Sequence, residues 1–373
     1  MPSVATGKRT IRIGVLKVAM TDGYVLLVTD RVDRGEAVMQ ALGGLLDIRV
    51  TGPDFDDQSI SAKHGRLEGV ITDIAFTRSS STRALNEIMR SAAVKAAPLM
   101  CMLRQNGEEN FLRAKALGAK VCIAGTTPPR ALAAAVVNTT HPNESIVDRL
   151  VNRGLAKTGS SLISLFEAAK DGTAIDVKLA DDGVDPVINA IQAGGIARWL
   201  DSVWVHDDTT YQHCLQVAGL AAAVAIQLKF PKADQQRFIR AALMHDLGKG
   251  RIPLEILNKP GIHDDDERAI MRTHARIGYE ILVDGGVKDG LTLDAALHHH
   301  EMLDGTGYPE QLRGDSVSDP VRLLTVCDIY AALSEKRSYK EAKKPEECFR
   351  ILYQMGSKLE RSMIDALAIT IMN

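Results

Sequence analysis

Histidine and aspartate residues recur at regular intervals in the C-terminal half of this 373-residue chain. Eight of its ten histidines lie between His206 and His300. Each interval equals one helix with its connection, so a helical bundle would bring the polar positions to a common point. Five positions follow one another at spacings of 32, 29, 25 and 29 residues: His213, His245-Asp246, His274, His299-His300 and Asp328.

Three of these positions lie on apolar faces that repeat every three or four residues, as in a helix. The face of His213 continues through Val217, Leu220, Val224 and Leu228, that of His274 through Ile270, Ile277 and Ile281, and that of Asp328 through Val321, Leu324 and Ala331. A single histidine on such a face is more often a core residue than a ligand. The five positions together favour a metal centre, because a buried carboxylate is costly without a cation.

Five histidines and two aspartates exceed what one ion needs, so the set predicts two ions that share a carboxylate. Imidazole and carboxylate ligands fit iron, manganese, zinc or nickel. The five cysteines are scattered and form no C-x-x-C pair, which argues against a zinc ribbon or a disulfide framework.

The order H…HD…H…HH…D resembles the HD superfamily of metal-dependent phosphohydrolases. Residues 299–309 read HHEMLDGTGYP and are similar to the HH-E-x-x-D-G-x-G-Y-P motif of the HD-GYP subfamily, and HDLGK at 245–249 also matches. The resemblance covers residues 196–350. It implies a phosphodiesterase that hydrolyses cyclic di-GMP, a bacterial second messenger, to linear pGpG and in some cases to GMP. The scattered cysteines favour a reducing compartment, so we expect the protein in the cytoplasm.

The resemblance also implies two divalent ions, with iron or manganese favoured. Asp246 would bridge them, and hydroxide from a water between the ions would attack the phosphodiester. Asp246 and Lys249 are the expected catalytic residues. Asp246 would hold both ions, and Lys249 lies one helical turn from Asp246 and can contact a phosphate oxygen. One ion would be held by His213, His245, Asp246 and Asp328, and the other by Asp246, His274, His299 and His300.

The expected substrate contacts are Lys249, Tyr308 for a guanine or phosphate, and Arg337 with Lys340 for the second phosphate. A loop anchor is the alternative for Tyr308, and a solvated face is the alternative for the last pair. The GYP loop is also expected to contact protein partners. A third ion is not expected, because Thr209 stands where some relatives have a glutamate, and Asp208 is one position out of register.

The elements that would position these residues are all helical from residue 196 onward. A helix over 144–169, a loop near 171–186 and a further helix are expected before it, with Gly172, Gly183 and Pro186 as the loop signals. We therefore predict a helical linker over 141–195 and an all-α HD-GYP bundle over 196–373.

The N-terminal region, 20–140, has a different pattern. Short apolar runs alternate with helical segments, which predicts an α/β domain with a parallel, flavodoxin-like sheet. The runs lie at 24–28, 47–50, 70–74, 98–102 and 118–123, and the helices at 34–46, 82–96, 108–117 and 129–137.

This order resembles the receiver domain of response regulators. Asp73 ends the third run, where receivers carry the phosphorylated aspartate, and Asp30 remains of the usual acidic pair. Thr29, Leu103 and Gly125 replace the second acid, the hydroxyl residue and the lysine, so we expect a degenerate receiver that regulates the C-terminal domain. Asp73 is a candidate phosphoacceptor, and the alternative is a dimerisation or docking module.

The charge balance limits the partners. The 45 basic and 47 acidic residues give a net charge of −2, so a broad nucleic-acid surface is not expected. No apolar run approaches the roughly 20 residues that a membrane span needs. The alternatives to an active enzyme are a cyclic di-GMP receptor or interaction adaptor, and a phosphohydrolase for another nucleotide.

Overall fold

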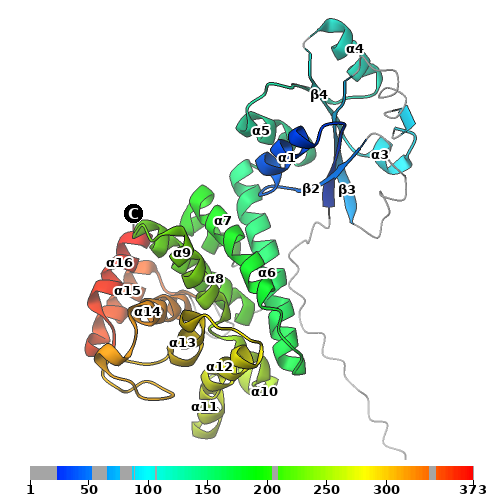
Figure 1. The fold of residues 1–373 in the computed structure, drawn as a ribbon. Coiled ribbons are helices and arrows are strands. Elements are labelled where there is room, and N and C mark those ends of the chain that lie inside the picture. The colour runs from blue at the N-terminus through cyan, green and yellow to red at the C-terminus, as the bar shows by residue number, and fades with distance from the viewer. Residues whose placement is uncertain are drawn as a thin grey trace, which may run out of the picture. The chain divides into compact units, whose positions relative to one another are not determined.

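The computed structural model describes residues 23–52, 65–75, 86–87, 89–105, 107–203, 209–335 and 342–372. These residues divide into two compact units, with the boundary between Arg153 and Gly154 (Figure 1). The boundary falls inside helix α6 (Ile146–Asp171). The domain limits that we place at 140 and 195 from the sequence stay predictions.

The N-terminal unit contains a parallel sheet of five strands in the order β2-β1-β3-β4-β5. This is the strand order of flavodoxin-like doubly wound folds. Thr29 at the end of β1 pairs with Asp73 at the end of β3, so the carboxyl ends of these strands lie side by side. The strands are β1 (Gly23–Thr29), β2 (Asp47–Thr51), β3 (Arg66–Asp73), β4 (Leu99–Leu103) and β5 (Val121–Ala124).

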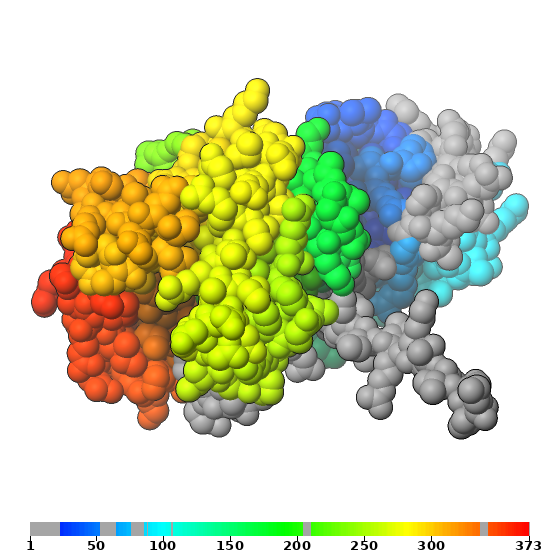
Figure 2. Space-filling model, turned by 90° about the horizontal axis from the view of Figure 1, so that it is seen from below, coloured from blue at the N-terminus to red at the C-terminus, as the bar shows by residue number. Residues whose placement is uncertain are grey.

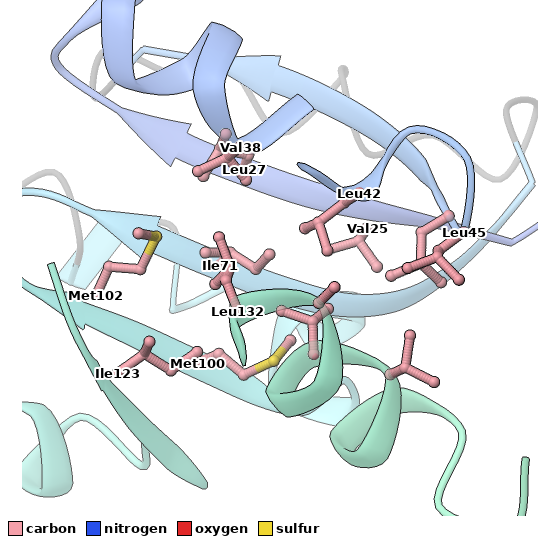
Figure 3. Packing of buried hydrophobic residues seen from close by; sticks show 14 residues of the cluster. Val25, Leu27, Val38, Leu42, Leu45, Ile71, Met100, Met102, Ile123 and Leu132 are labelled. Carbon is pink, nitrogen blue, oxygen red and sulfur yellow. The ribbon is translucent and has the colours of Figure 1, made fainter. Parts of the chain in front are cut away.

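Helices cover both faces of this sheet, as the alternating pattern predicts. On one face, Val38 of α1 and Leu132 of α5 pack against Leu27, Ile71 and Met100 of the strands (Figure 3). Helices α3 and α4 supply apolar residues to the cluster on the other face. The expected helix over 82–96 lies partly outside the described residues. The helices are α1 (Val32–Leu42), α3 (Ala92–Ala96), α4 (Glu108–Ala116) and α5 (Pro129–Thr140).

Helix α7 (Val177–Val203) shows that the loop expected over 171–186 is wrong beyond residue 176. Gly183 and Pro186 both lie inside the helix, and the carbonyl of Gly183 accepts a hydrogen bond from Thr158 Oγ1 at 2.9 Å. A buried apolar face on α7 outweighs the local preference of glycine and proline for a break. The chain departs from helical geometry instead at Gly195, whose φ of 74° suits glycine.

The C-terminal unit is helical, as expected; within its described residues the single β-bridge joins Asp304 and Arg313. Helix α8 is buried along most of its length and packs against α7, α9, α14 and α16. The elements are α8 (Thr209–Gln227), α9 (Lys232–Met244), η3 (Leu247–Arg251), α10 (Leu254–Leu257), α11 (Asp265–Arg272), α12 (His274–Asp284), α13 (Gly290–His298), η4 (Gly314–Ser316), α14 (Asp319–Ser334), α15 (Pro345–Gln354), η5 (Gly356–Lys358) and α16 (Arg361–Met372).

Two details of the apolar faces differ from the expectation. Leu228 and Ile270 are 44% and 40% exposed, although the spacing assigns both to buried faces. Leu228 lies just beyond the end of α8, and Ile270 belongs to α11, which ends before Thr273 and buries no residue. The single helix expected through His274 is therefore two helices, and α12 begins at His274 itself. Figure 2 shows the surface of α10 to α12 in yellow-green to yellow.

No helix in the described part of the chain is both long enough and apolar enough to cross a membrane.

Candidate metal centre

The seven predicted ligands come together from five parts of the C-terminal unit. All except His300 are at most 5% exposed, and His300 is partly exposed. The helices place them at their ends or on their buried faces: His213 on α8, His245 and Asp246 between α9 and η3, His274 at the start of α12, His299 and His300 after α13, and Asp328 on α14.

Asp246 lies between two groups of histidines. Its Oδ1 atom is 3.3 Å from His274 Nε2 and 3.6 Å from His299 Nε2. Its Oδ2 atom is 3.4 Å from His245 Nε2 and 3.7 Å from His213 Nε2. Two sets of side chains here could each hold an ion, with ligand atoms within 4.8 Å of one another: Asp246 with His274, His299 and His300, and Asp246 with His213 and His245.

Asp328 extends the second of these sets. Its Oδ1 atom is 2.7 Å from His213 Nε2 and 3.9 Å from His245 Nε2. Its Oδ2 atom points toward the other set, 3.8 Å from His300 Nδ1. Asp328 therefore lies where the sequence places it, beside His213 and His245.

The protonation of three histidines follows from their backbone contacts. The Nδ1 atoms of His245, His274 and His299 lie 2.7, 2.7 and 2.9 Å from backbone carbonyl oxygens three or four residues earlier in the chain. The carbonyls belong to Ala242, Met271 and Ala295, so the one that faces His274 comes from the end of α11. A carbonyl can only accept, so each Nδ1 carries the proton and each Nε2 keeps its lone pair, directed toward Asp246. His245 Nε2 and Asp246 Oδ1 are buried and have no hydrogen-bond partner among the described residues. The residues present thus fit a metal ion.

The charges of the centre fit the same conclusion. Burial lowers the pKa of His274 and that of His300 further, which favours neutral imidazoles. Burial alone would raise the pKa of Asp246, but Lys249 and His245 outweigh it and hold that pKa well below its ordinary value. His213 likewise outweighs the effect of burial on Asp328 and holds the pKa of that carboxyl below its ordinary value. Neutral imidazoles and ionised carboxylates are the forms that bind metals.

Residues 201–362 match the family model described as the HD domain. This region is an HD domain. Its residues 299–309 carry the motif on which the resemblance to the HD-GYP subfamily rests. The chain is 33% identical over 212 residues to a cyclic di-GMP phosphodiesterase of Pseudomonas aeruginosa, covering 57% of this chain and 51% of that protein.

Further relatives carry related names. The chain is 35% identical to a cyclic di-GMP phosphodiesterase response regulator of Xanthomonas campestris, covering 46% of each chain. It is 38% identical to a 3'3'-cGAMP-specific phosphodiesterase of Vibrio cholerae over 38% of this chain and 31% of that protein. The chain thus spans between 31% and 51% of the length of these relatives.

The fold is similar to that of a solved protein of Bdellovibrio bacteriovorus described as an HDG"Y"P protein. The TM-score is 0.50 at 15% identity, over 72% of this chain and 82% of that one.

Lys249 of the HD domain contacts Asp246 directly. Its Nζ atom is 2.5 Å from Asp246 Oδ2, and its side chain is 21% exposed. Burial lowers the pKa of Lys249, but the neighbouring Asp246 outweighs this and raises it. Lys249 is therefore a cation beside the proposed metal site, and its contact with a phosphate stays a prediction.

Gly248 does not end a helix, although glycine is the residue most typical of a helix C-terminus. Helix α9 already ends at Met244, and Gly248 lies inside η3 without a positive φ. A Cβ atom at this position would lie 2.0 Å from the carbonyl oxygen of His274 and 2.5 Å from the backbone nitrogen of Gly278. The missing side chain lets α12 approach the segment that carries His245 and Asp246.

Within the HD domain, Glu301 holds the loop that carries the GYP motif, although the sequence marks this residue only as part of the motif. The carboxylate of Glu301 is buried and accepts hydrogen bonds from the backbone nitrogens of Glu310 and Leu312, at 2.6 and 3.1 Å. The backbone nitrogen of Tyr308 donates to the carbonyl of His300. These contacts place the centroid of the Tyr308 ring 4.7 Å from the centroid of the His300 ring.

The other predicted substrate contacts, Arg337 and Lys340, lie outside the described residues, as do Asp208 and the side chain of Thr209.

In the N-terminal unit, Asp73 is fully buried at the end of β3 and is surrounded by cations. It accepts hydrogen bonds from Arg34 Nε at 2.8 Å, Arg104 Nε at 3.0 Å and Thr29 Oγ1 at 3.2 Å. Arg104 also pairs with Asp30. Burial alone would raise the pKa of Asp73, but the two arginines outweigh it and lower that pKa. Neither arginine is marked as a partner of Asp73 by the sequence, because they lie 39 and 31 residues from it along the chain.

We expect Arg104→Met to destabilise the N-terminal unit by about 3 kcal/mol at neutral pH, because it removes one cation from a buried carboxylate. The folded-state pKa of Asp73 lies below its value in the unfolded chain, so this stabilisation is present above about pH 4 and is lost as the pH falls further. The difference between wild type and variant should therefore shrink in acid.

Urea unfolding followed by circular dichroism at neutral pH and below about pH 4 measures this difference. Arg31→Met is the matched control, since Arg31 pairs with Asp33 in an exposed position and its loss should change little. An equal loss for Arg104→Met at both pH values would contradict the assigned charge interaction.

Proposed function

We propose that this chain is a metal-dependent phosphodiesterase that hydrolyses cyclic di-GMP, with pGpG as the first product and GMP as the product of further cleavage. The observation that carries this proposal is the position of Asp246, whose two oxygens face two separate groups of histidines. The names of the relatives support the substrate.

In this proposal, Asp246, His213, His245 and Asp328 would hold one divalent ion, and Asp246, His274, His299 and His300 would hold a second. Two bound divalent ions would supply an activated water and neutralise charge on the phosphodiester. Iron and manganese are the proposed metals, while the ligand set also accepts zinc or nickel.

The protein's own groups hold this arrangement ready. Backbone carbonyls fix the rings of His245, His274 and His299, so that their lone pairs are oriented before any ligand arrives. Burial of the cluster excludes bulk water and strengthens electrostatic interactions with a bound phosphate. Lys249, next to Asp246, adds a positive charge where a phosphate oxygen would lie.

The test uses the full chain, purified anaerobically and loaded with iron or with manganese, and incubated with cyclic di-GMP. Chromatography should show pGpG, and GMP on longer incubation. If neither metal form yields either product, the proposal is wrong, and tight binding without turnover would favour a cyclic di-GMP receptor instead. A parallel assay with 3'3'-cGAMP addresses the activity named for a relative.

The N-terminal unit is proposed as a receiver-like regulatory module. Its strand order and the position of Asp73 at the end of β3 support this proposal. Because Arg34 and Arg104 already neutralise Asp73, a protein-interaction role that includes self-association fits this unit better than phosphoryl transfer. Incubation with acetyl phosphate and Mg²⁺ should leave Asp73 unmodified in intact-mass spectra.

A further inference from the structure

Arg272, the last residue of α11, lies over the ring of Tyr308 at the edge of the HD metal centre. The guanidinium carbon is 5.1 Å from the ring centroid. The centroid of the same tyrosine ring is 4.7 Å from that of the His300 ring and 6.4 Å from that of the His274 ring. Arg272 is exposed, and Tyr308 lies between its guanidinium group and the histidine cluster.

Arg272 differs from the neighbouring cations in its charge balance. Arg268 pairs with Asp265, Arg276 pairs with Glu310, and Lys249 pairs with Asp246. Within the described parts of the chain, no carboxylate lies within ion-pair distance of Arg272. Its charge is therefore available to an anion that approaches the centre from solvent.

The tyrosine restricts where this charge can go. A guanidinium group that stacks on an aromatic face keeps its N–H donors directed outward from its edges. Those donors match the oxygens of a phosphate in a two-bond arrangement. The GYP loop holds Tyr308 through Glu301, so the platform for Arg272 is itself fixed.

We propose that Arg272, supported by Tyr308, is a substrate-binding residue that holds the phosphate of the cyclic dinucleotide that is not being cleaved. The inference rests on the proposed function. The two phosphates of a cyclic dinucleotide lie on opposite sides of its ring, so only one can reach the buried histidines and Asp246. The other must stay nearer to solvent, where the structure places the exposed side chain of Arg272.

This role predicts a change in binding more than in the chemical step. Arg272→Ala should raise the KM for cyclic di-GMP about tenfold and change kcat little, because the contact is equal in ground and transition states. Arg272→Lys should recover part of the affinity, since it keeps the charge but loses the planar two-bond geometry. Arg268→Ala, an exposed arginine of the same helix, is the matched control and should behave as wild type.

A second substrate separates binding of the remote phosphate from damage to the centre. Bis(p-nitrophenyl) phosphate has a single phosphodiester, so the loss of kcat/KM in Arg272→Ala should be much smaller with it than with cyclic di-GMP. Arg272→Ala combined with Tyr308→Leu should be less harmful than the sum of the two single changes, because both remove one supported contact.

The outcomes distinguish this inference from the proposed function. If wild type hydrolyses cyclic di-GMP and Arg272→Ala has an unchanged KM, or loses equal activity on both substrates, the inference is wrong while the function stands. Equilibrium dialysis of cyclic di-GMP against wild type and Arg272→Ala extends the test to a protein that binds without turnover. If wild type neither binds nor hydrolyses it, both proposals fail.

Discussion

Asp246→Ala is expected to lose both metal ions and to reduce cyclic di-GMP hydrolysis by about three orders of magnitude or more, to background. The reason is that each of the two ligand sets includes Asp246, and its two oxygens face different histidines. No other described residue belongs to both sets. Elemental analysis of the anaerobically purified variant, together with the product assay, measures both effects.

Two further variants sharpen this test. Asp246→Asn keeps the shape of the side chain but offers a single uncharged oxygen, so it should retain at most one ion. Asp265→Ala removes an exposed carboxylate of the same domain and should keep both ions and full activity. Two metals per chain in Asp246→Ala would refute the bridging assignment, provided that circular dichroism shows a folded protein.

The sequence was sufficient to predict the ligand cluster because its signal is periodic. His213 lies on an apolar helical face, and the intervals to the later ligands equal one helix with its connection. Such spacing shows which helices must meet, even without any knowledge of their angles. It is for this reason that the residues found together around Asp246 are the ones that the sequence singles out.

The contacts that the sequence could not show are those set by tertiary packing. Arg34 belongs to α1 and Arg104 directly follows β4, and both contact Asp73 at the end of β3. Nothing in the sequence around either arginine indicates this ionic partner. Arg272 likewise looks like an ordinary surface residue of α11 until the GYP loop places Tyr308 beneath it. Its position two residues before His274 is the one signal that could have marked it.

Glycine and proline show the same limit in the backbone. The sequence pattern predicts a loop at Gly183 and Pro186, but a buried face keeps this stretch helical, and the break comes at Gly195. Gly248 follows the ligand pair His245-Asp246 and resembles a helix terminator. Its actual constraint comes from the backbone of α12, which lies 26 residues further along at His274.

Gly248→Ala is therefore expected to destabilise the HD domain by about 3 kcal/mol or more, since the added methyl group would meet backbone atoms that cannot rotate away. The Cβ would lie 2.0 Å from the His274 carbonyl oxygen, so either α12 or the η3 segment must shift. His274 Nε2 and Asp246 Oδ1 are 3.3 Å apart in the structure. Such a shift would move these two atoms apart and should therefore also weaken metal binding.

Urea unfolding followed by tryptophan fluorescence measures this loss, because both tryptophans of the chain, Trp199 and Trp204, lie in the C-terminal half. Gly290→Ala is the matched control: no atom lies within 4 Å of its added Cβ, and its helical position should make the change neutral or slightly stabilising. Equal unfolding midpoints for the two variants would show that α12 does not depend on the missing side chain at Gly248. A lower midpoint for Gly248→Ala alone, with fewer bound ions per chain, would tie the packing of that glycine to the metal centre itself.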